Sequence, residues 1–351
     1  MNILVITQTI NENDPVLGFF CDWILEFSRV YEKVTVIALG VGKYTFPSNV
    51  SVYSLGKEKK KGRLIYLSQF FSFIFKKRKD YDVVFVHMNP VYLILAGWYW
   101  RLLGKGVFLW YTHRQIDLKL RLATFFAHRV FTASSEGFQI KSKKKTVVGH
   151  GINVKRFDQP LKKEYREDSF NIVHVGRITP IKNIDVLIEA VYLLQKKNIP
   201  VQLSLIGPAV TEEELREKNR LLKLIQKYNL DGQVTFPGGL LFEQLPLIFH
   251  RADASVNLAP TGGMDKAVLE SMLSGTVTFV SNTAFHPLLG QYGKDLIFSE
   301  RDAVDLSEKL ETFWRKSREE KERAGTFLQQ RAREEHNLST LIKKVYTYGL
   351  E

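Results

Sequence analysis

Short apolar runs alternate with segments of helical period along the whole chain. In the first half, residues 2–7 and 34–39 are apolar runs that suit buried parallel strands, and residues 18–30 between them have the spacing of a helix. This strand, helix, strand order is a βαβ unit, which predicts a parallel sheet. Further strands are expected at residues 82–87, 107–111 and 130–133. The first half is therefore predicted to be a domain of repeated strand and helix units.

The same pattern restarts after residues 160–168, a polar and charged stretch that is the best candidate for a linker. Strands are predicted at residues 170–175, 201–206, 234–236, 254–258, 277–280 and 296–298. Helices are predicted at residues 184–197, 211–228, 245–250, 265–273, 303–317 and 320–349. Because 351 residues exceed what one hydrophobic core usually spans, we expect two domains in an α/β fold with two Rossmann-like halves.

The composition is that of a globular protein, with 45% apolar and 25% charged residues. Cys21 is the single cysteine, so no disulfide framework is expected, and no Cys/His cluster has the spacing of a zinc site. The chain opens directly into a strand without the basic region of a signal peptide. The cytoplasm is therefore the predicted compartment.

The net charge of +13 is unevenly distributed along the chain. Residues 1–165 contain 26 Lys+Arg against 12 Asp+Glu, whereas residues 166–351 contain 24 against 25. A basic half predicts an anionic partner, such as a membrane surface, a nucleic acid or an acidic substrate. The alternative is a basic surface that is solvated and has no partner.

Residues 57–79 concentrate this charge around an apolar, aromatic centre at residues 64–75, where Leu64, Leu67, Phe71, Ile74 and Phe75 share one side at helical spacing. The centre is too short to span a bilayer, but a basic amphipathic helix with aromatics suits the membrane interface. We therefore predict peripheral attachment to the inner face of an anionic membrane. The alternative is a domain helix with its apolar face on the sheet and its basic ends in water. The predicted patch consists of Lys59, Lys60, Lys61, Arg63, Lys76, Lys77, Arg78 and Lys79.

Candidate chemistry is concentrated in residues 257–282. A glycine-rich turn there leads from a strand end into the helix at 265–273, which places free N–H groups and the positive end of a helix dipole at the carboxyl edge of a parallel sheet. Glu270 lies inside this helix, where a carboxylate must find donors, such as sugar hydroxyls or a neighbouring cation. Arg177 and Lys182 follow the strand at 170–175 and could clamp a diphosphate.

Two residues of the first half lie at comparable positions. His113 follows the strand at 107–111, and Gly18 stands where a loop enters a helix. Each also has a structural interpretation, because a lone histidine is usually structural and a glycine often only makes a turn.

Together these features resemble the family 4 glycosyltransferases, which have the glycosyltransferase-B fold. The resemblance covers most of the chain and depends on three blocks in order: His150-Gly151-Ile152-Asn153 with Phe157, Val175-Gly176-Arg177 with Lys182-Asn183, and residues 265–272 with Ser274-Gly275. The first block usually has Asp where Asn153 stands.

The resemblance implies two Rossmann-like domains that face each other across a cleft. An acceptor-binding domain would comprise residues 1–162, a nucleotide-sugar-binding domain residues 163–330, and a C-terminal helix at 331–351 would pack back on the first domain. The resemblance also implies a retaining hexosyltransferase with neither a metal nor another cofactor. The donor would be a nucleotide-diphosphate sugar, with UDP favoured. The acceptor would be a glycan or a lipid-linked sugar in cell-surface polysaccharide or glycolipid synthesis.

By position, the resemblance assigns roles to individual residues. Arg177 and Lys182 would hold the diphosphate and neutralise the leaving nucleotide, while Glu270 would accept hydrogen bonds from the ribose. Leu241 would lie near the base, and His113 on the acceptor side near the transferred sugar. The implied catalytic residues are His113, Arg177, Lys182 and Asp265. The implied donor-binding residues are Gly18, Arg177, Lys182, Gly207, Leu241, Gly263, Met264, Asp265, Lys266, Val268 and Glu270.

One position departs from the family pattern. The family often has a second Glu eight positions before the one that matches Glu270, and this chain has Gly262 there. That carboxylate normally contacts the transferred sugar, and Asp265 is near enough in sequence to compensate. Either the sugar is held differently or transfer is weak.

Two other functions are compatible with the same sequence. A non-catalytic protein that binds a nucleotide-sugar or a nucleic acid could use the basic first half, although no named nucleic-acid motif is present and no nucleic-acid partner is expected. An epimerase on the same two-domain fold would need a pair of acid and base carboxylates, which the sequence does not obviously supply.

Overall fold

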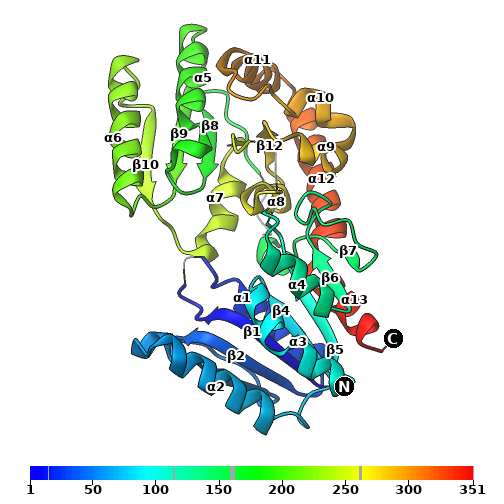
Figure 1. Cartoon of the computed structure of the whole chain (residues 1–351). Coiled ribbons are helices and arrows are strands. Elements are labelled where there is room, and N and C mark those ends of the chain that lie inside the picture. The colour runs from blue at the N-terminus through cyan, green and yellow to red at the C-terminus, as the bar shows by residue number, and fades with distance from the viewer. Residues whose placement is uncertain (15, 114, 159–162, 261–262, 351) are drawn as a thin grey trace. The chain divides into compact units, whose positions relative to one another are not determined.

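The computed structural model describes residues 1–14, 16–113, 115–158, 163–260 and 263–350. Its contacts divide the chain into two compact units (Figure 1). Unit 1 comprises Met1–Asn153 and His336–Glu351, and unit 2 comprises Val154–Glu335. The chain therefore passes between the units twice, once after Asn153 and once after Glu335.

Unit 1 contains a parallel sheet that has, over the described residues, seven strands in the order β3-β2-β1-β4-β5-β6-β7. The strands are β1 (Ile3–Ile10), β2 (Val34–Val41), β3 (Val50–Ser54), β4 (Val83–His87), β5 (Gly106–Trp110), β6 (Arg129–Thr132) and β7 (Lys145–Val147). Strand β1 is buried on both faces, because Ile3 and Val5 belong to one apolar cluster and Leu4 and Ile6 to another. Burial on both faces explains the continuous apolar run at its start, residues 3–6.

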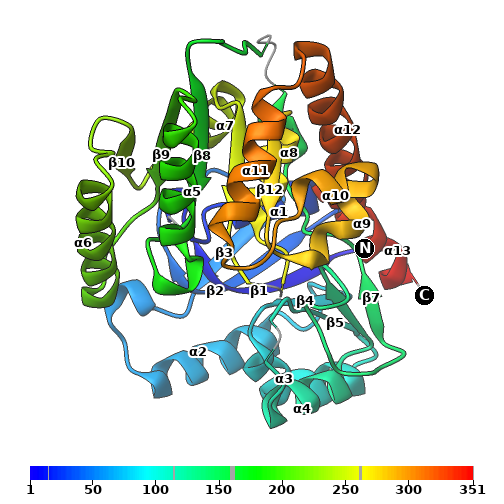
Figure 2. The same cartoon turned by 90° about the horizontal axis from the view of Figure 1, so that it is seen from above.

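Helices cover both faces of this sheet. Helices α1 (Phe20–Val30) and α13 (Leu338–Leu350) pack together and share the cluster on one face. Helices α2 (Arg63–Lys76), α3 (Pro90–Leu102) and α4 (Leu118–Phe126) share the cluster on the other face, where Figure 2 shows them along one side of the sheet. Right-handed crossovers account for this division, because α1 leads toward β3 whereas α2, α3 and α4 lead toward β7.

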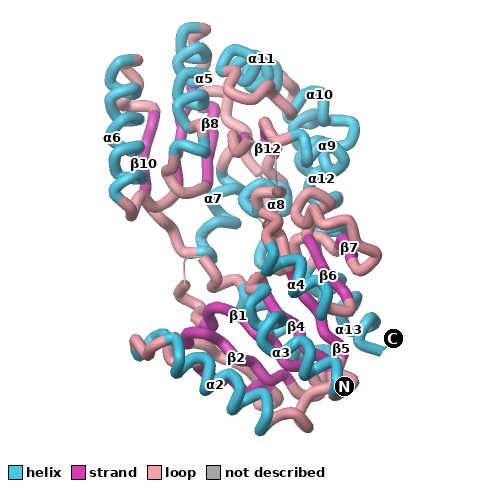
Figure 3. The backbone as a smooth tube through the Cα atoms, in the orientation of Figure 1, coloured by secondary structure: helices cyan, strands magenta, loops and turns pink. Residues whose placement is uncertain are grey.

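Unit 2 contains a parallel sheet with the order β10-β9-β8-β11-β12 (Figure 3). Its strands are β8 (Phe170–Val175), β9 (Val201–Ile206), β10 (Val234–Gly238), β11 (Ala254–Asn257) and β12 (Val277–Val280). Its helices are α5 (Ile184–Lys196), α6 (Glu212–Lys227), α7 (Leu245–Arg251), α8 (Lys266–Leu273), α9 (His286–Leu289), α10 (Gly293–Leu296), α11 (Ala303–Trp314) and α12 (Arg318–His336). Connections leave the neighbouring strands β8 and β11 in opposite directions, and ligands of open α/β sheets bind at such a switch point.

Four details of the sequence prediction are corrected by the structure. Residues 296–298 are not a strand, since α10 ends at Leu296 and only Ile297 forms an isolated bridge, with Val280. Residues 320–349 are two helices, because Asn337 interrupts them and its side chain caps α13 by accepting a hydrogen bond from the Ser339 N–H at 2.9 Å. The strands β3 and β7 were not predicted, and both lie at edges of the unit 1 sheet.

No helix among the described residues combines the length and the apolarity that crossing a bilayer requires.

Candidate functional site

The loop after β8 is fixed by a close backbone contact with the end of β9. A Cβ atom at Gly207 would lie 1.8 Å from the carbonyl oxygen of Gly176, a distance that no side chain tolerates. The Gly176 N–H in turn donates a hydrogen bond of 2.9 Å to the carbonyl of Ile206. Gly207 therefore acts sterically, by letting two chain segments meet at the carboxyl edge of the sheet.

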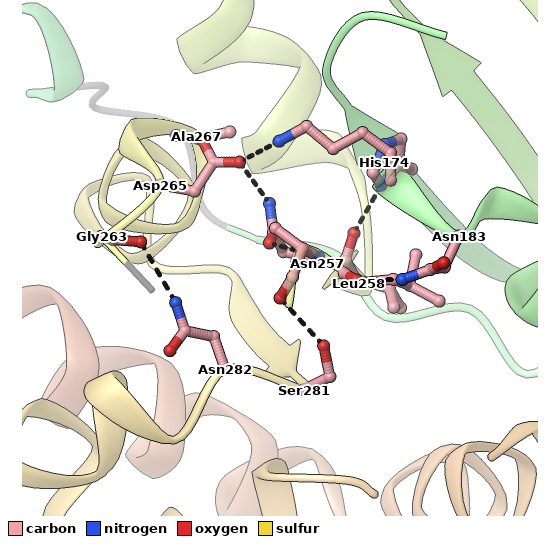
Figure 4. A network of polar contacts seen from close by, with 12 residues as sticks. His174, Asn183, Asn257, Leu258, Gly263, Asp265, Ala267, Ser281 and Asn282 are labelled. Atoms are coloured by element: carbon pink, nitrogen blue, oxygen red, sulfur yellow. Dashed lines mark hydrogen bonds and ion pairs between the residues drawn. The ribbon is translucent and has the colours of Figure 1, made fainter. Parts of the chain in front are cut away.

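Asp265 connects three elements at the switch point. Its carboxylate forms an ion pair with Lys182, which ends the short helical turn Pro180–Lys182 after β8. The same oxygen accepts a hydrogen bond of 3.0 Å from the side-chain amide of Asn257 at the end of β11 (Figure 4). The other oxygen accepts a bond of 3.2 Å from the Ala267 N–H and caps α8. A single carboxylate thus holds a cation beside the first turn of α8.

The Asp265 carboxyl is stabilised in its ionised form. Burial alone would raise the pKa of Asp265, but the Lys182 ammonium and the hydrogen bonds from Lys182, Asn257 and Ala267 outweigh burial and lower it. Asp265 is therefore a carboxylate at neutral pH.

Glu270 behaves in the opposite way. It lies in the second turn of α8 and is 4% exposed, and its carboxyl receives no hydrogen bond from the described residues. Burial raises the pKa of Glu270 to about 7; Asp265 adds to the rise, and the cations of Lys266 and Arg156 oppose it. The carboxyl consequently has unused acceptor capacity in a place where donors are needed.

Arg177 lies apart from this network in the described structure. Its side chain is 69% exposed, and its guanidinium is 3.4 Å from Glu214. Glu214 also completes the capping box of α6 with Thr211, so Arg177 is held toward α6. The structure brings Lys182, Asp265, Lys266 and Glu270 together and places Arg177 beside α6, on the loop after the same strand β8.

The family model described as Glycosyl transferases group 1 matches residues 155–331, which are just over half of the chain and nearly all of unit 2. The chain belongs to this family. Membership in the group 1 glycosyltransferases confirms the resemblance inferred from the three sequence blocks.

Curated relatives of this group 1 family member are similar over part of the chain. The mannosylfructose-phosphate synthase of Agrobacterium fabrum is 25% identical over 183 residues, which are 49% of this chain and 40% of that protein. The serotype-specific mannosyltransferase WbdA of Escherichia coli is 29% identical over 157 residues, which are 44% of this chain and 18% of WbdA. The match therefore spans less than half the length of each of these relatives.

Solved structures resemble the whole chain. HepE of Anabaena in complex with UDP has a TM-score of 0.75 at 14% identity, over 99% of both chains. Sucrose-phosphate synthase of Thermosynechococcus elongatus has a TM-score of 0.73 at 16% identity, over 99% of this chain and 97% of that one. These similarities confirm the predicted glycosyltransferase-B fold with its two Rossmann-like domains.

The other predicted donor residues of unit 2 lie in the loop after β10, before α8 and within α8. Leu241 is exposed in the loop after β10, and its N–H donates to the side chain of Gln244 at 2.9 Å. The carbonyl of Gly263 accepts a bond of 3.1 Å from Asn282 (Figure 4), and Met264 precedes the cap of α8. Val268 is buried inside α8. Gly262, the predicted departure from the family pattern, lies outside the described residues.

Gly18 and His113 belong to unit 1. A Cβ atom at Gly18 would lie 2.6 Å from the carbonyl oxygen of Asp14 and 2.7 Å from that of Glu12, so this glycine permits a tight loop before α1. His113 is exposed after β5, and its ring lies edge-on to Tyr111 at 5.8 Å.

Two residues of the network were not assigned from the sequence. His174 on β8 is fully buried, and its Nδ1–H donates to the Val256 carbonyl at 2.9 Å, which joins β8 to β11. Burial lowers the pKa of His174 to about 4, so the ring is neutral. Asn257 presents its amide to Asp265. The available signal was a polar side chain inside an apolar strand, which identifies a position but no partner.

The described residues contain no group of three or more His, Cys, Asp or Glu side chains placed to hold a metal ion.

Proposed function

We propose that this chain is a metal-independent, retaining glycosyltransferase that moves a hexose-type sugar from a nucleotide-diphosphate sugar, with UDP favoured, to a glycan or lipid-linked acceptor. The reaction would serve cell-surface polysaccharide or glycolipid synthesis. The observation that carries the proposal is the Lys182–Asp265 ion pair at the start of α8, with the buried Glu270 inside that helix. HepE, whose solved structure holds UDP, and the mannosyltransferase WbdA support the donor class.

The diphosphate would be held by Lys182 and by the first turn of α8. An ammonium group has three N–H donors, and Asp265 needs one of them, so the others can reach phosphate oxygens. The dipole of α8 adds positive potential at the same place. As the bond to the sugar breaks, these groups would stabilise the negative charge that develops on the leaving nucleotide.

Arg177 would join this site after a change of partner. Its guanidinium is exposed, and the distance of 3.4 Å to the Glu214 carboxylate is long for an ion pair. Such a pair at the surface adds little stability. A diphosphate offers the guanidinium a stronger, bidentate partner. When the donor binds, the Arg177 side chain would therefore give up its contact with Glu214 of α6 and contact the nucleotide.

Glu270 would accept hydrogen bonds from the ribose hydroxyls of the donor. Its buried carboxyl lacks donors among the described residues, and two neighbouring hydroxyls would supply them. Bonds to the carboxylate favour the ionised form, so donor binding would lower the pKa of Glu270 from about 7.

Asp265 and His113 would act at the transferred sugar. Asp265 stays ionised and lies at the start of α8, where its charge could stabilise the positive anomeric carbon as the bond to the phosphate breaks. The acceptor oxygen would bond to that carbon, and its proton would pass to the departing phosphate oxygen. His113, exposed at the end of β5, is assigned to the acceptor side by the family resemblance.

A nucleotide panel tests the donor site. Differential scanning fluorimetry of the full chain with UDP, GDP and ADP should show the largest rise in melting temperature for UDP, because a ligand that binds only the folded state stabilises it by mass action. Lys182→Ala should weaken UDP binding about tenfold or more, since it removes a charged hydrogen bond. Lys223→Ala, an exposed lysine on α6, is the matched control.

Transfer is tested separately with UDP-hexoses in the presence of EDTA. Release of UDP that depends on an added glycan acceptor, with an unchanged anomeric configuration in the product, supports the full proposal. Equal UDP binding by wild type and Lys182→Ala would refute the assigned site. Tight binding of every donor without transfer to any acceptor would favour a non-catalytic nucleotide-sugar binder.

A further inference from the structure

The helices α2, α3 and α4 each carry a second apolar side. They lie on one face of the unit 1 sheet (Figure 2), and the side chains that face the sheet are a separate set that includes Phe70, Trp100 and Leu120. The outward residues of each helix are separated by three, four, seven or eight positions, which places them on one side of that helix. They are Leu64, Leu67 and Phe75 on α2; Val91, Trp98 and Leu102 on α3; and Leu118, Leu122 and Phe125 on α4.

These stripes are strongly exposed. Leu64 is 81%, Leu102 77% and Phe125 70% exposed, and the large ring of Trp98 is 48% exposed. The predicted grouping of Ile74 with the outward residues is wrong, because Ile74 is fully buried against the sheet. A helix needs only one apolar side to join a core, so the outward stripes require another explanation.

The three stripes belong to neighbouring helices in contact. The rings of Phe75 on α2 and Tyr99 on α3 meet at a centroid distance of 4.9 Å. A Cβ atom at Gly97 of α3 would lie 2.6 Å from the Cβ atom of Phe126, so α3 and α4 touch closely. The exposed apolar residues therefore lie on three adjoining helices, and we call them together the three-helix face.

Positive charge surrounds this face. Residues 57–129, which include all three helices, contain 15 Lys+Arg and 4 Asp+Glu. Exposed cations lie next to the stripes at Arg78 after α2, Arg101 beside Leu102 on α3, and Lys119 beside Leu118 on α4. Unit 1 as a whole has 24 basic and 11 acidic residues, whereas unit 2 has 26 of each. The net charge of the protein therefore lies entirely on the unit that carries the face.

We infer that the three-helix face docks on an anionic membrane surface, with its apolar side chains in the acyl boundary and its cations at the lipid phosphates. Apolar residues bracketed by Lys and Arg, with an exposed Trp at the boundary, are the pattern of interfacial binding. A second copy of the chain is a poorer occupant, because a symmetric dimer would bring two strongly basic faces together. The inference concerns unit 1 alone and does not depend on the transfer reaction.

This surface differs from the lysine-rich patch predicted from residues 57–79. That prediction attributes binding to one basic amphipathic helix with an aromatic centre, whereas the inference adds α3 and α4, with Trp98, Leu102 and Phe125 as inserting groups. The distinction is testable because apolar insertion and charge attraction respond differently to substitution and to salt.

Vesicle flotation of the full-length protein tests the face. We expect binding to vesicles of phosphatidylcholine with 30% phosphatidylglycerol and little binding to phosphatidylcholine alone. Leu102→Glu with Phe125→Glu should reduce binding about tenfold or more, since two inserting groups become anionic. Raising the salt from ~50 mM to ~500 mM should weaken binding severalfold by screening. The matched control is Leu215→Glu with Val304→Glu, two exposed apolar residues of unit 2, which should bind as wild type does.

Insertion is measured by fluorescence quenching with brominated lipids. Trp98 is the most exposed described tryptophan, and its quenching should disappear in Trp98→Phe while vesicle binding persists. The double glutamate variant must retain the UDP-induced rise in melting temperature of wild type, which separates failure of docking from failure of the donor site. Unchanged vesicle binding by that variant would overturn the inference. So would a dimer in sedimentation velocity that the variant abolishes, or no binding to anionic vesicles at all.

Discussion

At the scale of single residues, hydrogen-bond partners give Asp265 and Glu270 opposite pKa shifts, although burial alone would raise the pKa of both. Asp265 has three hydrogen-bond donors, one of which is the Lys182 ammonium, so its pKa falls in spite of burial. Glu270 accepts no hydrogen bond from the described residues, and burial raises its pKa to about 7 against the opposing charges of Lys266 and Arg156. The first carboxylate organises the site before a ligand arrives, and the second is left to a ligand.

The raised pKa of Glu270 predicts a stability cost that Glu270→Gln removes. The folded state keeps the proton to about pH 7, whereas the unfolded chain loses it near the ordinary pKa of 4.5, so stability falls as pH rises between these values and is constant above them. The shift corresponds to about 3 kcal/mol. Glu270→Gln should therefore be more stable than wild type by up to about this amount at pH 8 and equal to it at pH 4.5, as measured by urea unfolding.

The same substitution, which is expected to raise stability, should lower the affinity for UDP. UDP affinity of wild type should rise with pH through about 7, because the ribose hydroxyls need the ionised carboxyl, and it should be lower and independent of pH in Glu270→Gln. Glu319→Gln, an exposed carboxyl on α12, serves as the control. A variant that loses stability at pH 8, or that binds UDP with the pH profile of wild type, would contradict the assignment.

At the level of residues, the sequence predicted features set by neighbouring positions but not contacts between distant ones. The turn, the helix and Glu270 could be placed because a strand end, a glycine pair and a helical period are neighbours in the chain. The partners could not, since Lys182 and Asp265 are 83 residues apart and their pairing depends on the strand order. His174 was missed for the same reason, because its acceptor at Val256 lies 82 residues away on β11.

At the scale of elements, the ends of β8 and β9 are joined at Gly207, and this contact predicts the effect of a methyl group. Gly207→Ala would place Cβ 1.8 Å from the Gly176 carbonyl oxygen, so the loop that carries Arg177 and Lys182 must move. We expect a loss of about 2 kcal/mol or more in unfolding free energy, with weaker UDP binding. Gly232→Ala is the control, since a Cβ there meets nothing within 4 Å. Equal stability of the two variants in urea unfolding would contradict this account of Gly207.

The elements that the sequence predicted are the ones with a strong apolar period. Strands β1 and β8 are mostly apolar and mostly buried, and they lie where the pattern places them. The missed strands β3 and β7 are short edge strands with partly exposed residues, so neither has the signal of a buried strand. The sequence predicted one helix at 320–349 because asparagine can occur inside a helix. In the structure Asn337 instead separates two helices and caps α13.

At the scale of the whole molecule, the restart of the βα pattern after residues 160–168 is what made two Rossmann-like halves predictable. The point at which the chain re-enters unit 1 had no comparable signal. There the Ile152 N–H donates to the His336 carbonyl at 2.7 Å, and the Leu338 N–H donates to the Ile152 carbonyl at 2.9 Å. These bonds join segments far apart in sequence, so only the folded chain reveals them.

The separation of a neutral unit 2 from a basic unit 1 predicts that two ligands leave separate footprints on one chain. Hydrogen exchange measured by mass spectrometry with UDP should slow at residues 176–183, 239–245 and 263–273, because the loops after β8 and β10 and the start of α8 lose opening motions when the nucleotide binds. Anionic vesicles should instead slow exchange in α2, α3 and α4 and leave those unit 2 peptides unchanged.

The controls for this experiment follow from the two proposals. Lys182→Ala should erase the UDP footprint and keep the vesicle footprint, whereas Leu102→Glu with Phe125→Glu should do the reverse. Protection of the three helices by UDP would place the nucleotide on unit 1 and contradict the donor assignment. Protection of residues 263–273 by vesicles would show that lipid phosphate competes for the nucleotide site. The positive charge of unit 1 would then not be a separate membrane-binding surface.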